Sequence, residues 1–532
     1  MKLKKILALT LAAVMIFCFV AACNDNSGTT TPASSDTGSA AGTGTTTQTT
    51  TSTDDDDDVP AGSLEDRPDL RFLIWGRTYD PNTDIATVRK MEFTGYNVIY
   101  EMLPTEGGDE RLMLEMSAGA DFDLVELNPI MFGRLASMGM LLPIDDLLAQ
   151  YGNYMLQEVA QAGWDASKDP NGNIVALPRQ SGDNQGHAFG SRFDWILMTK
   201  QEILDELDLT IPKTLDEFTD FLITIRDAKG VPPLTSNNDI HFLDIMTAFD
   251  IPNIAYLEKD SGFEHLIQQP QYREYLRYIA MLYADGLLDP DVPTNNNENK
   301  DAKFTSPTAA FVAQYATWEL GRIVPALEAN GLSVNPAAFE QPLMGSDGTY
   351  LLRNFYGVSK YYGIPASAAN PDHAINYFNL LSEPETFLRS HIGDEGIHWE
   401  MVNGEYRPIL PEFDELNWAN QFVGMQNRPA EFAQWQARVR KTVEMADNYV
   451  FVNSNLPNAR LFLDRSTLTN SLPAVQENGQ AVNQLWADWR MQAIVNNNLT
   501  DADFDTIIQR MMDEGLDEML DEMSEWARQN PR

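Results

Sequence analysis

Aromatic side chains stand beside planar polar side chains at several points of this 532-residue sequence. Trp75 is followed by Gly76 and Arg77, and Trp318 is followed by Glu319. A flat ring can stack on the C–H face of a sugar, while guanidinium and carboxylate groups form paired hydrogen bonds with sugar hydroxyls. The alternative for both tryptophans is core packing. The pattern favours a carbohydrate-binding site.

No comparable pattern points to catalysis. The sequence contains no G-x-S-x-G elbow, no H-E-x-x-H and no phosphate loop. Glycoside hydrolysis needs two carboxyl groups about 5–10 Å apart, and no short segment fixes such a pair. Asp394 and Glu395 near His398 form the best local cluster, and we interpret it as structural or ligand-contacting. We therefore predict no catalytic residue and no cofactor.

Composition excludes some partners. The net charge is −41, which repels nucleic acid, so we expect no DNA or RNA partner. Six histidines and two cysteines offer little for a transition metal. The length suggests two or three domains.

The first residues have the plan of an export signal. Lys2, Lys4 and Lys5 precede an apolar run at 6–20, and Ala21-Ala22 supplies small residues. The run of about 15–17 residues is shorter than the roughly 20 that a spanning helix needs, although a permanent anchor helix is the alternative. Losing residues 1–22 removes three lysines and no acid, leaving a net charge of −44. Residues 27–60 are rich in Thr, Ser, Gly and Asp and read as a disordered tether.

The body alternates predicted strands and helices. Strands are expected at 70–75, 97–103 and 122–127, with helices at 84–93 and 106–116, an order that predicts a doubly wound, mostly parallel sheet. Ligands of such sheets lie at the carboxyl ends of strands, where Trp75 and Asn128 fall.

Further elements follow along the chain. A strand at 173–178 leads to Arg179 and Gln180, and Thr214 with Glu217 predicts a capping box. The last hundred residues look helical. Core or interlobe packing is the preferred interpretation for four tryptophans there, Trp435, Trp486, Trp489 and Trp526.

The motifs together resemble a known family. Val20-Ala21-Ala22-Cys23 is similar to the bacterial lipobox, "IVALP" to a hinge strand, and "GLLDPD" and "GDEGIHW" to internal family segments. The chain resembles the extracellular solute-binding proteins of bacterial ABC importers (family 1 type), in a lipoprotein subgroup associated with oligosaccharides. The resemblance implies an α/β, two-lobed, periplasmic-binding-protein-like (type II) fold, in which each lobe is a mixed sheet flanked by helices and hinge strands join the lobes.

The resemblance also divides the chain. It implies a lipoprotein signal peptide at 1–22, lipid on Cys23 and a tether at 23–67. Cys18 would leave with the signal. The N-terminal lobe is expected at 68–178 and 355–425, and the C-terminal lobe at 179–354 and 426–532. Many relatives carry a calcium loop after the "P.T.dEF" helix, but residues 226–233 contain one acid. Calcium takes six to eight oxygens, so we predict no metal there.

The expected protein is a non-enzymatic, monomeric receptor, lipid-anchored on the extracellular face of the cell membrane. It would capture a carbohydrate between its lobes and deliver it to the transmembrane subunits of an ABC permease. A binder of peptide or another small solute, and an extracellular glycan-degrading enzyme, are the alternatives. The candidate ligand-binding residues are Trp75, Arg77, Asn128, Arg179, Gln180, Trp195, Trp318, Glu319, Tyr356 and Trp399.

Overall fold

The computed structural model describes residues 64, 66–76, 80–104, 107–181, 195–335, 343, 348–355, 357–416, 435–454 and 459–531. The chain divides into two units, residues 1–58 and 59–532, and all described residues belong to the second. The predicted signal, Cys23 and most of the predicted tether lie outside them. Arg67, at the predicted end of the tether, lies 4.7 Å from the centre of the Tyr96 ring.

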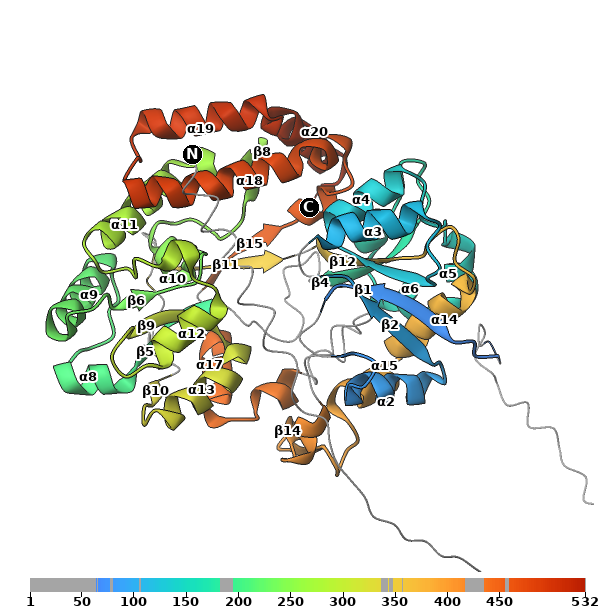
Figure 1. Ribbon diagram of the computed structural model, residues 1–532, viewed down its shortest axis with the longest axis horizontal. Helices are drawn as coiled ribbons and strands as arrows, with labels where there is room; N and C mark the ends of the chain where they lie inside the picture. The colour runs from blue at the N-terminus through green and yellow to red at the C-terminus, as the bar shows by residue number, and fades with distance from the viewer. Residues whose placement is uncertain are drawn as a thin grey trace, which may run out of the picture. The chain divides into compact units, whose positions relative to one another are not determined.

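The first sheet has the order β2-β1-β3-β12-β4 (Figure 1). Its strands are β1 (Leu70–Ile74), β2 (Val98–Met102), β3 (Leu124–Leu127), β4 (Ala176–Ser181) and β12 (Gly357–Gly363). Strands β1, β2 and β3 run parallel, as the alternating pattern predicted, while β12 is antiparallel to both β3 and β4. The sheet is therefore mixed, and a strand from much later in the sequence closes it.

Both faces of this sheet are buried. Phe72 and Tyr362 belong to one apolar cluster, while their neighbours Leu73 and Tyr361 belong to another, because successive strand residues point to opposite faces. The helices that accompany the sheet, among the described residues, are α2 (Ile85–Thr94), α3 (Gly108–Ser117), α4 (Pro129–Ser137), α5 (Asp145–Tyr151), α6 (Asn153–Glu158), α7 (Gln161–Asp165), α14 (Pro371–Ser382) and α15 (Pro384–Ile392).

The second sheet has the order β10-β5-β9-β6. Its strands are β5 (Trp195–Lys200), β6 (Leu234–Thr235), β9 (Val312–Ala316) and β10 (Val334–Asn335). Strand β9 is parallel to β6 and antiparallel to β5. The carboxyl ends of β6 and β9 and the amino end of β5 consequently meet at one edge.

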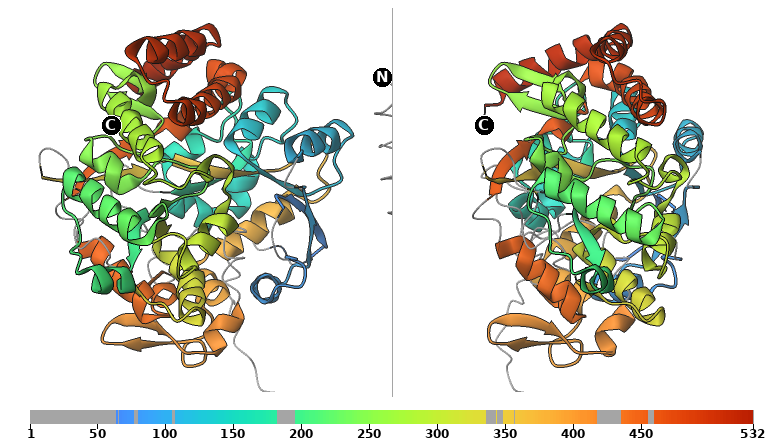
Figure 2. Two further views of the ribbon diagram at one scale, coloured as in Figure 1. Left: turned by 60° about the vertical axis from the view of Figure 1, so that its left-hand side comes forward. Right: turned by 90° about the vertical axis from the view of Figure 1, so that its left-hand side faces the viewer.

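Helices surround this second sheet and share one large apolar core with it. They are α8 (Gln201–Leu207), α9 (Leu215–Lys229), α10 (Leu243–Ala248), α11 (Pro270–Ala284), α12 (Asn297–Thr305), α13 (Leu320–Ala329), α17 (Val443–Ser454), α18 (Pro473–Asn496), α19 (Asp501–Asp513) and α20 (Leu516–Gln529). Figures 1 and 2 show α18, α19 and α20 side by side in every view.

The predicted cap of α9 forms with one change of partner. The Thr214 hydroxyl accepts a hydrogen bond from the Glu217 N–H at 3.2 Å, as expected. The Glu217 carboxylate, however, accepts from the Lys213 N–H at 2.7 Å. The side chain thus satisfies a backbone donor one residue before the cap.

Three small strand pairs complete the structure. Strand β11 (Tyr350–Phe355) runs parallel to β15 (Ala459–Asp464), and two hairpins form from β7 (Tyr256–Lys259) with β8 (Gly262–His265) and from β13 (Trp399–Val402) with β14 (Glu405–Pro408). Strand β11 directly precedes β12 of the first sheet. The segment after β15 also contacts β12, because the Thr467 hydroxyl accepts a hydrogen bond from the Val358 N–H at 3.2 Å.

Candidate functional site

Trp195 and Trp318 meet at the edge of the second sheet where β6 and β9 end. Trp195 begins β5 and pairs with Ala316, the last residue of β9, so the short helix Thr317–Glu319 brings Trp318 beside it. The two ring centres are 5.4 Å apart with the planes at 87°. This edge-to-face contact holds both rings in fixed orientations.

The two rings line a cavity of about 640 Å³, called the tryptophan cavity below. Its volume lies within the roughly 300–1,000 Å³ that is typical of small-molecule sites. The lining residues are Trp195, Asn297, Trp318, Glu319, Gly321, Arg322, Pro325, Asp414, Trp435, Arg438, Val439, Lys441, Thr442 and Met445. Aromatic faces and planar polar groups therefore share one space, as carbohydrate binding requires.

Glu319 sits in the wall of this cavity with several partners. Its carboxylate accepts from the Ala316 N–H at 3.0 Å and from Arg322 at 2.7 Å, and lies 3.8 Å from the Lys300 ammonium. Burial raises the pKa of Glu319, against the lowering effect of Lys300, and burial lowers the pKa of Lys300. The carboxylate thus fixes the turn that carries Trp318, and it also reaches the cavity.

Another part of the lining comes from residues 435–445. Trp435 is 8% exposed, and Arg438 donates to the His391 carbonyl in α15 at 2.6 Å. Burial lowers the pKa of Arg438 to about 9. Lys441 forms an ion pair with Asp414. Trp435, Arg438 and Lys441 are spaced three residues apart. This spacing of an aromatic residue and two cations was a sequence signal for the cavity lining, but our sequence prediction did not include these residues in the site.

The candidates near the first sheet lie elsewhere. The backbone N–H of Trp75 donates to the Glu126 carboxylate at 3.1 Å. The Trp75 ring packs closely on α3, since a Cβ added to Gly108 would lie 2.4 Å from the ring. Asn128 caps α4 by accepting from the Met131 N–H at 2.8 Å, and it donates to Asp109 at 3.1 Å. Neither residue lines the tryptophan cavity.

The remaining candidates divide between described and undescribed residues. Arg179 is half-buried in β4, and its carbonyl accepts from the Ser359 hydroxyl at 3.2 Å. Trp399 donates from its indole to the Gly393 carbonyl at 3.0 Å and packs on Tyr406 of its own hairpin. Arg77, Tyr356 and the side chain of Gln180 lie outside the described residues.

Two arginines bind the acidic cluster of Asp394 and Glu395. The Asp394 carboxylate accepts hydrogen bonds from Arg89 at 3.1 Å and from Arg389 at 2.9 Å. Burial would raise the pKa of Asp394, but these hydrogen bonds outweigh that effect and lower it. The His398 ring accepts from the Asp394 N–H at 3.0 Å. These contacts agree with the structural interpretation of the cluster.

The metal-ligating side chains and the helices of the described residues bear on metal and membrane binding. No group of three or more His, Cys, Asp or Glu side chains in the described ranges is placed to hold a metal ion. In the predicted metal-free loop, Arg226 pairs with Asp227 at 2.7 Å and donates to the Asp285 carbonyl at 2.8 Å. No helix within the described ranges is long and apolar enough to cross a bilayer.

A cavity of about 710 Å³ shares no lining residue with the tryptophan cavity. Arg465 and Trp526 line it, but Arg465 is engaged by Glu258 at 2.5 Å and by the Asn530 carbonyl at 2.9 Å. None of the predicted ligand-binding residues lines this cavity. We favour the smaller tryptophan cavity because it lies at carboxyl ends of strands.

Solved structures share this fold. The chain is similar to the Streptococcus pneumoniae ABC-transporter substrate-binding protein FusA, an EF-hand mutant in complex with fructo-nystose, with a TM-score of 0.66 and 17% identity over 87% of this chain and 99% of that one. It is also similar to an HMO-binding, ABC-transporter-associated solute-binding protein from Bifidobacterium longum infantis, with a TM-score of 0.60 and 15% identity over 86% of this chain and 98% of that one. The predicted two-lobed, periplasmic-binding-protein-like fold is confirmed.

Sequence comparison agrees. An uncharacterized protein in the butB 5' region of Niallia circulans is 27% identical over 258 residues, which span 48% of this chain and 98% of the relative. The family model described as bacterial extracellular solute-binding protein matches residues 89–396. That match covers more than half of the sequence, so the chain belongs to the bacterial extracellular solute-binding protein family.

Proposed function

We propose that this protein is the lipid-anchored receptor of an ABC importer that captures an oligosaccharide in the tryptophan cavity and delivers it, chemically unchanged, to a membrane permease. Family membership implies an extracellular or surface location. Two of the fold neighbours are binding proteins of ABC transporters: one is in complex with fructo-nystose, and the other is HMO-binding. These likenesses support the transport role and the carbohydrate class.

One observation carries the proposal. Trp195 and Trp318 stand at 87° in a cavity of about 640 Å³ that also contains carboxylate, guanidinium and ammonium groups. Perpendicular aromatic faces can contact two rings of a bent sugar chain, while the polar groups bond to hydroxyls. A peptide site that recognised an extended strand would instead need an exposed sheet edge.

A thermal-shift screen tests the ligand class. The full mature chain would be melted with neutral malto-, cello-, xylo-, manno- and fructo-oligosaccharides, with uronic-acid oligosaccharides and with short peptides. A ligand at 100 times its dissociation constant adds about 2.7 kcal/mol to the unfolding free energy. We expect the melting temperature to rise with oligosaccharides. A rise with peptides alone would refute the carbohydrate assignment.

The anchor has its own test. Since Cys23 follows Val20-Ala21-Ala22, we expect Cys23→Ala to abolish incorporation of a radioactive fatty acid, whereas Cys18→Ala, the matched control, should label like the parent. Equal labelling of the Cys23→Ala variant and the parent would rule out lipidation at this residue.

A further inference from the structure

A second, smaller cavity lies against α18 and is called the α18 pocket below. Its volume is about 310 Å³, and its lining comes from α18, from the segment after β15 and from residues near β7. The residues that matter most here are Asn253, Tyr256, Asp464, Asn483, Trp486 and Arg490. Our sequence prediction assigned none of them to ligand binding, and Trp486 was assigned to packing.

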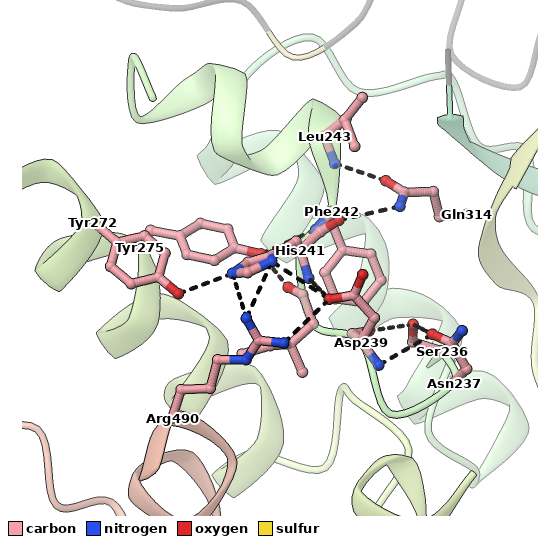
Figure 3. A network of polar contacts seen from close by, with 11 residues as sticks. Ser236, Asn237, Asp239, His241, Phe242, Leu243, Tyr272, Tyr275, Gln314 and Arg490 are labelled. Carbon is pink, nitrogen blue, oxygen red and sulfur yellow. Dashed lines mark hydrogen bonds and ion pairs between the residues drawn. The ribbon is translucent and has the colours of Figure 1, made fainter. Parts of the chain in front are cut away.

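Arg490 is held in place at this pocket (Figure 3). Its guanidinium carbon lies 4.7 Å from the centre of the Trp486 ring, and one nitrogen lies 3.4 Å and 3.5 Å from the two ring nitrogens of His241. The Asp239 carboxylate lies 4.0 Å from another guanidinium nitrogen. Burial and then the Arg490 charge lower the pKa of His241 to about 4. His241 is therefore neutral near pH 7 and accepts from Arg490.

Uncharged groups complete the lining of the pocket. Trp486 is 7% exposed and contributes an indole ring. Asn253 and Asn483, which also line the pocket, offer amides that both give and accept hydrogen bonds.

A polar chain connects this pocket to the tryptophan cavity. Asn297, which lines the tryptophan cavity, accepts from the Asn237 amide at 2.9 Å. Asn237 in turn accepts from the Asp239 N–H at 3.1 Å, and Asp239 faces Arg490. Figure 3 shows Asp239 between Asn237 and Arg490. This row of polar contacts follows the carboxyl end of β6, next to the carboxyl end of β9, and ligands of such sheets lie at the carboxyl ends of strands.

We propose that the α18 pocket is a second subsite, which holds one neutral sugar ring of the oligosaccharide whose other rings occupy the tryptophan cavity. This inference rests on the proposed function and deepens it. The volume is at the lower end of the ligand-site range, so it suits a single ring. Arg490 and Asp464 are the charged groups among the described lining residues and have opposite signs, which favours a neutral ring over a sugar acid.

Calorimetry with the sugars of the screen, in every length from mono- to hexasaccharide, tests the subsite. Asn253→Ala and Arg490→Gln should weaken the affinity for the longer sugars about five- to tenfold, the equivalent of one hydrogen bond. Both changes should leave unchanged the affinity for the shortest sugar that binds. Asn496→Ala, an exposed change at the end of α18, is the matched control and should alter no affinity. Asn253 is half-buried, so its variant should fold.

The outcomes separate the two proposals. Unchanged affinity of both pocket variants at every length, with normal binding by the parent, would overturn the subsite alone. Tighter binding of uronic-acid sugars than of neutral ones, lost in Arg490→Gln, would overturn the neutral-ring assignment. If the parent bound no sugar at all, the proposed function and the subsite would both be wrong.

Discussion

Lys90 shows how burial sets the behaviour of a single residue. It is 1% exposed in α2, and burial lowers its pKa to about 7, despite the opposing charge of Asp84. The unfolded chain keeps an ordinary lysine pKa near 10.4. Between these values the unfolded state binds more protons, so stability should rise with pH by up to about 1.4 kcal/mol per unit.

We therefore expect Lys90→Met to flatten the rise in unfolding free energy between about pH 7 and 10. Urea melts of the parent and the variant across this range measure the difference. Lys168→Met, at a half-buried lysine paired with Asp165 at 2.6 Å, is the matched control and should keep the parent's slope. Parallel curves for the parent and Lys90→Met would contradict the buried, neutral amine.

The candidate residues differed in how far the sequence could place them. Trp195 and Trp318 end up together because two antiparallel strands bring distant segments to one edge. The sequence indicated a strand around Trp195 and an element end at Trp318, but it did not show their contact, since that contact depends on strand pairing. Trp435 belongs to the same cavity through long-range packing, which periodicity along one helix does not report.

Elements were predicted best where the signal is local. Strand β1, helices α2 and α3 and the α9 cap follow from an apolar run rich in strand formers, from helical spacing and from a Thr–Glu pair. Strands β12 and β15 could not be assigned to their partners, because the contacts that pair them span roughly 100 to 230 residues. Topology at that range depends on packing, which a single sequence does not display.

The segment after β15 is fastened by a buried ion pair. Arg465 reaches Glu258 of β7 at 2.5 Å and 2.9 Å, with the two side chains 7% and 6% exposed, and lies 5.0 Å from the Trp526 ring. Removing one partner leaves a buried charge, so Arg465→Met should cost about 3–5 kcal/mol of unfolding free energy.

Adding Glu258→Gln to that variant should recover part of the loss, because the orphaned charge is gone. Arg528→Met, which breaks the exposed pair with Glu525 at 2.6 Å, is the matched control and should change stability by less than about 1 kcal/mol. Denaturant melts measure all three variants. Equal, small losses of unfolding free energy in Arg465→Met and Arg528→Met would show that the Arg465–Glu258 pair does not stabilise this segment.

At the scale of the whole molecule, the central claim is that a two-lobed protein holds sugar in the tryptophan cavity without changing it. Charge supports a binding role for that space, because Arg322, Arg438 and Lys441 gather there in a chain of net charge −41. Cations in this cavity can hydrogen-bond to several hydroxyls at once. The fold alone does not decide the ligand, since function lies in the site.

Calorimetry on the parent, Trp318→Ala and Trp164→Ala, with the best oligosaccharide of the screen, tests this claim most directly. We predict that Trp318→Ala weakens binding by about 1–3 kcal/mol with little loss of stability, as for a buried aromatic anchor. Trp164, 4% exposed in the core of the first sheet, should show the reverse when changed to alanine: about 3–5 kcal/mol of lost stability and unchanged affinity. The recovered sugar should be intact. Unchanged affinity with lost stability in Trp318→Ala, or cleaved sugar that a protein-free control lacks, would contradict the account.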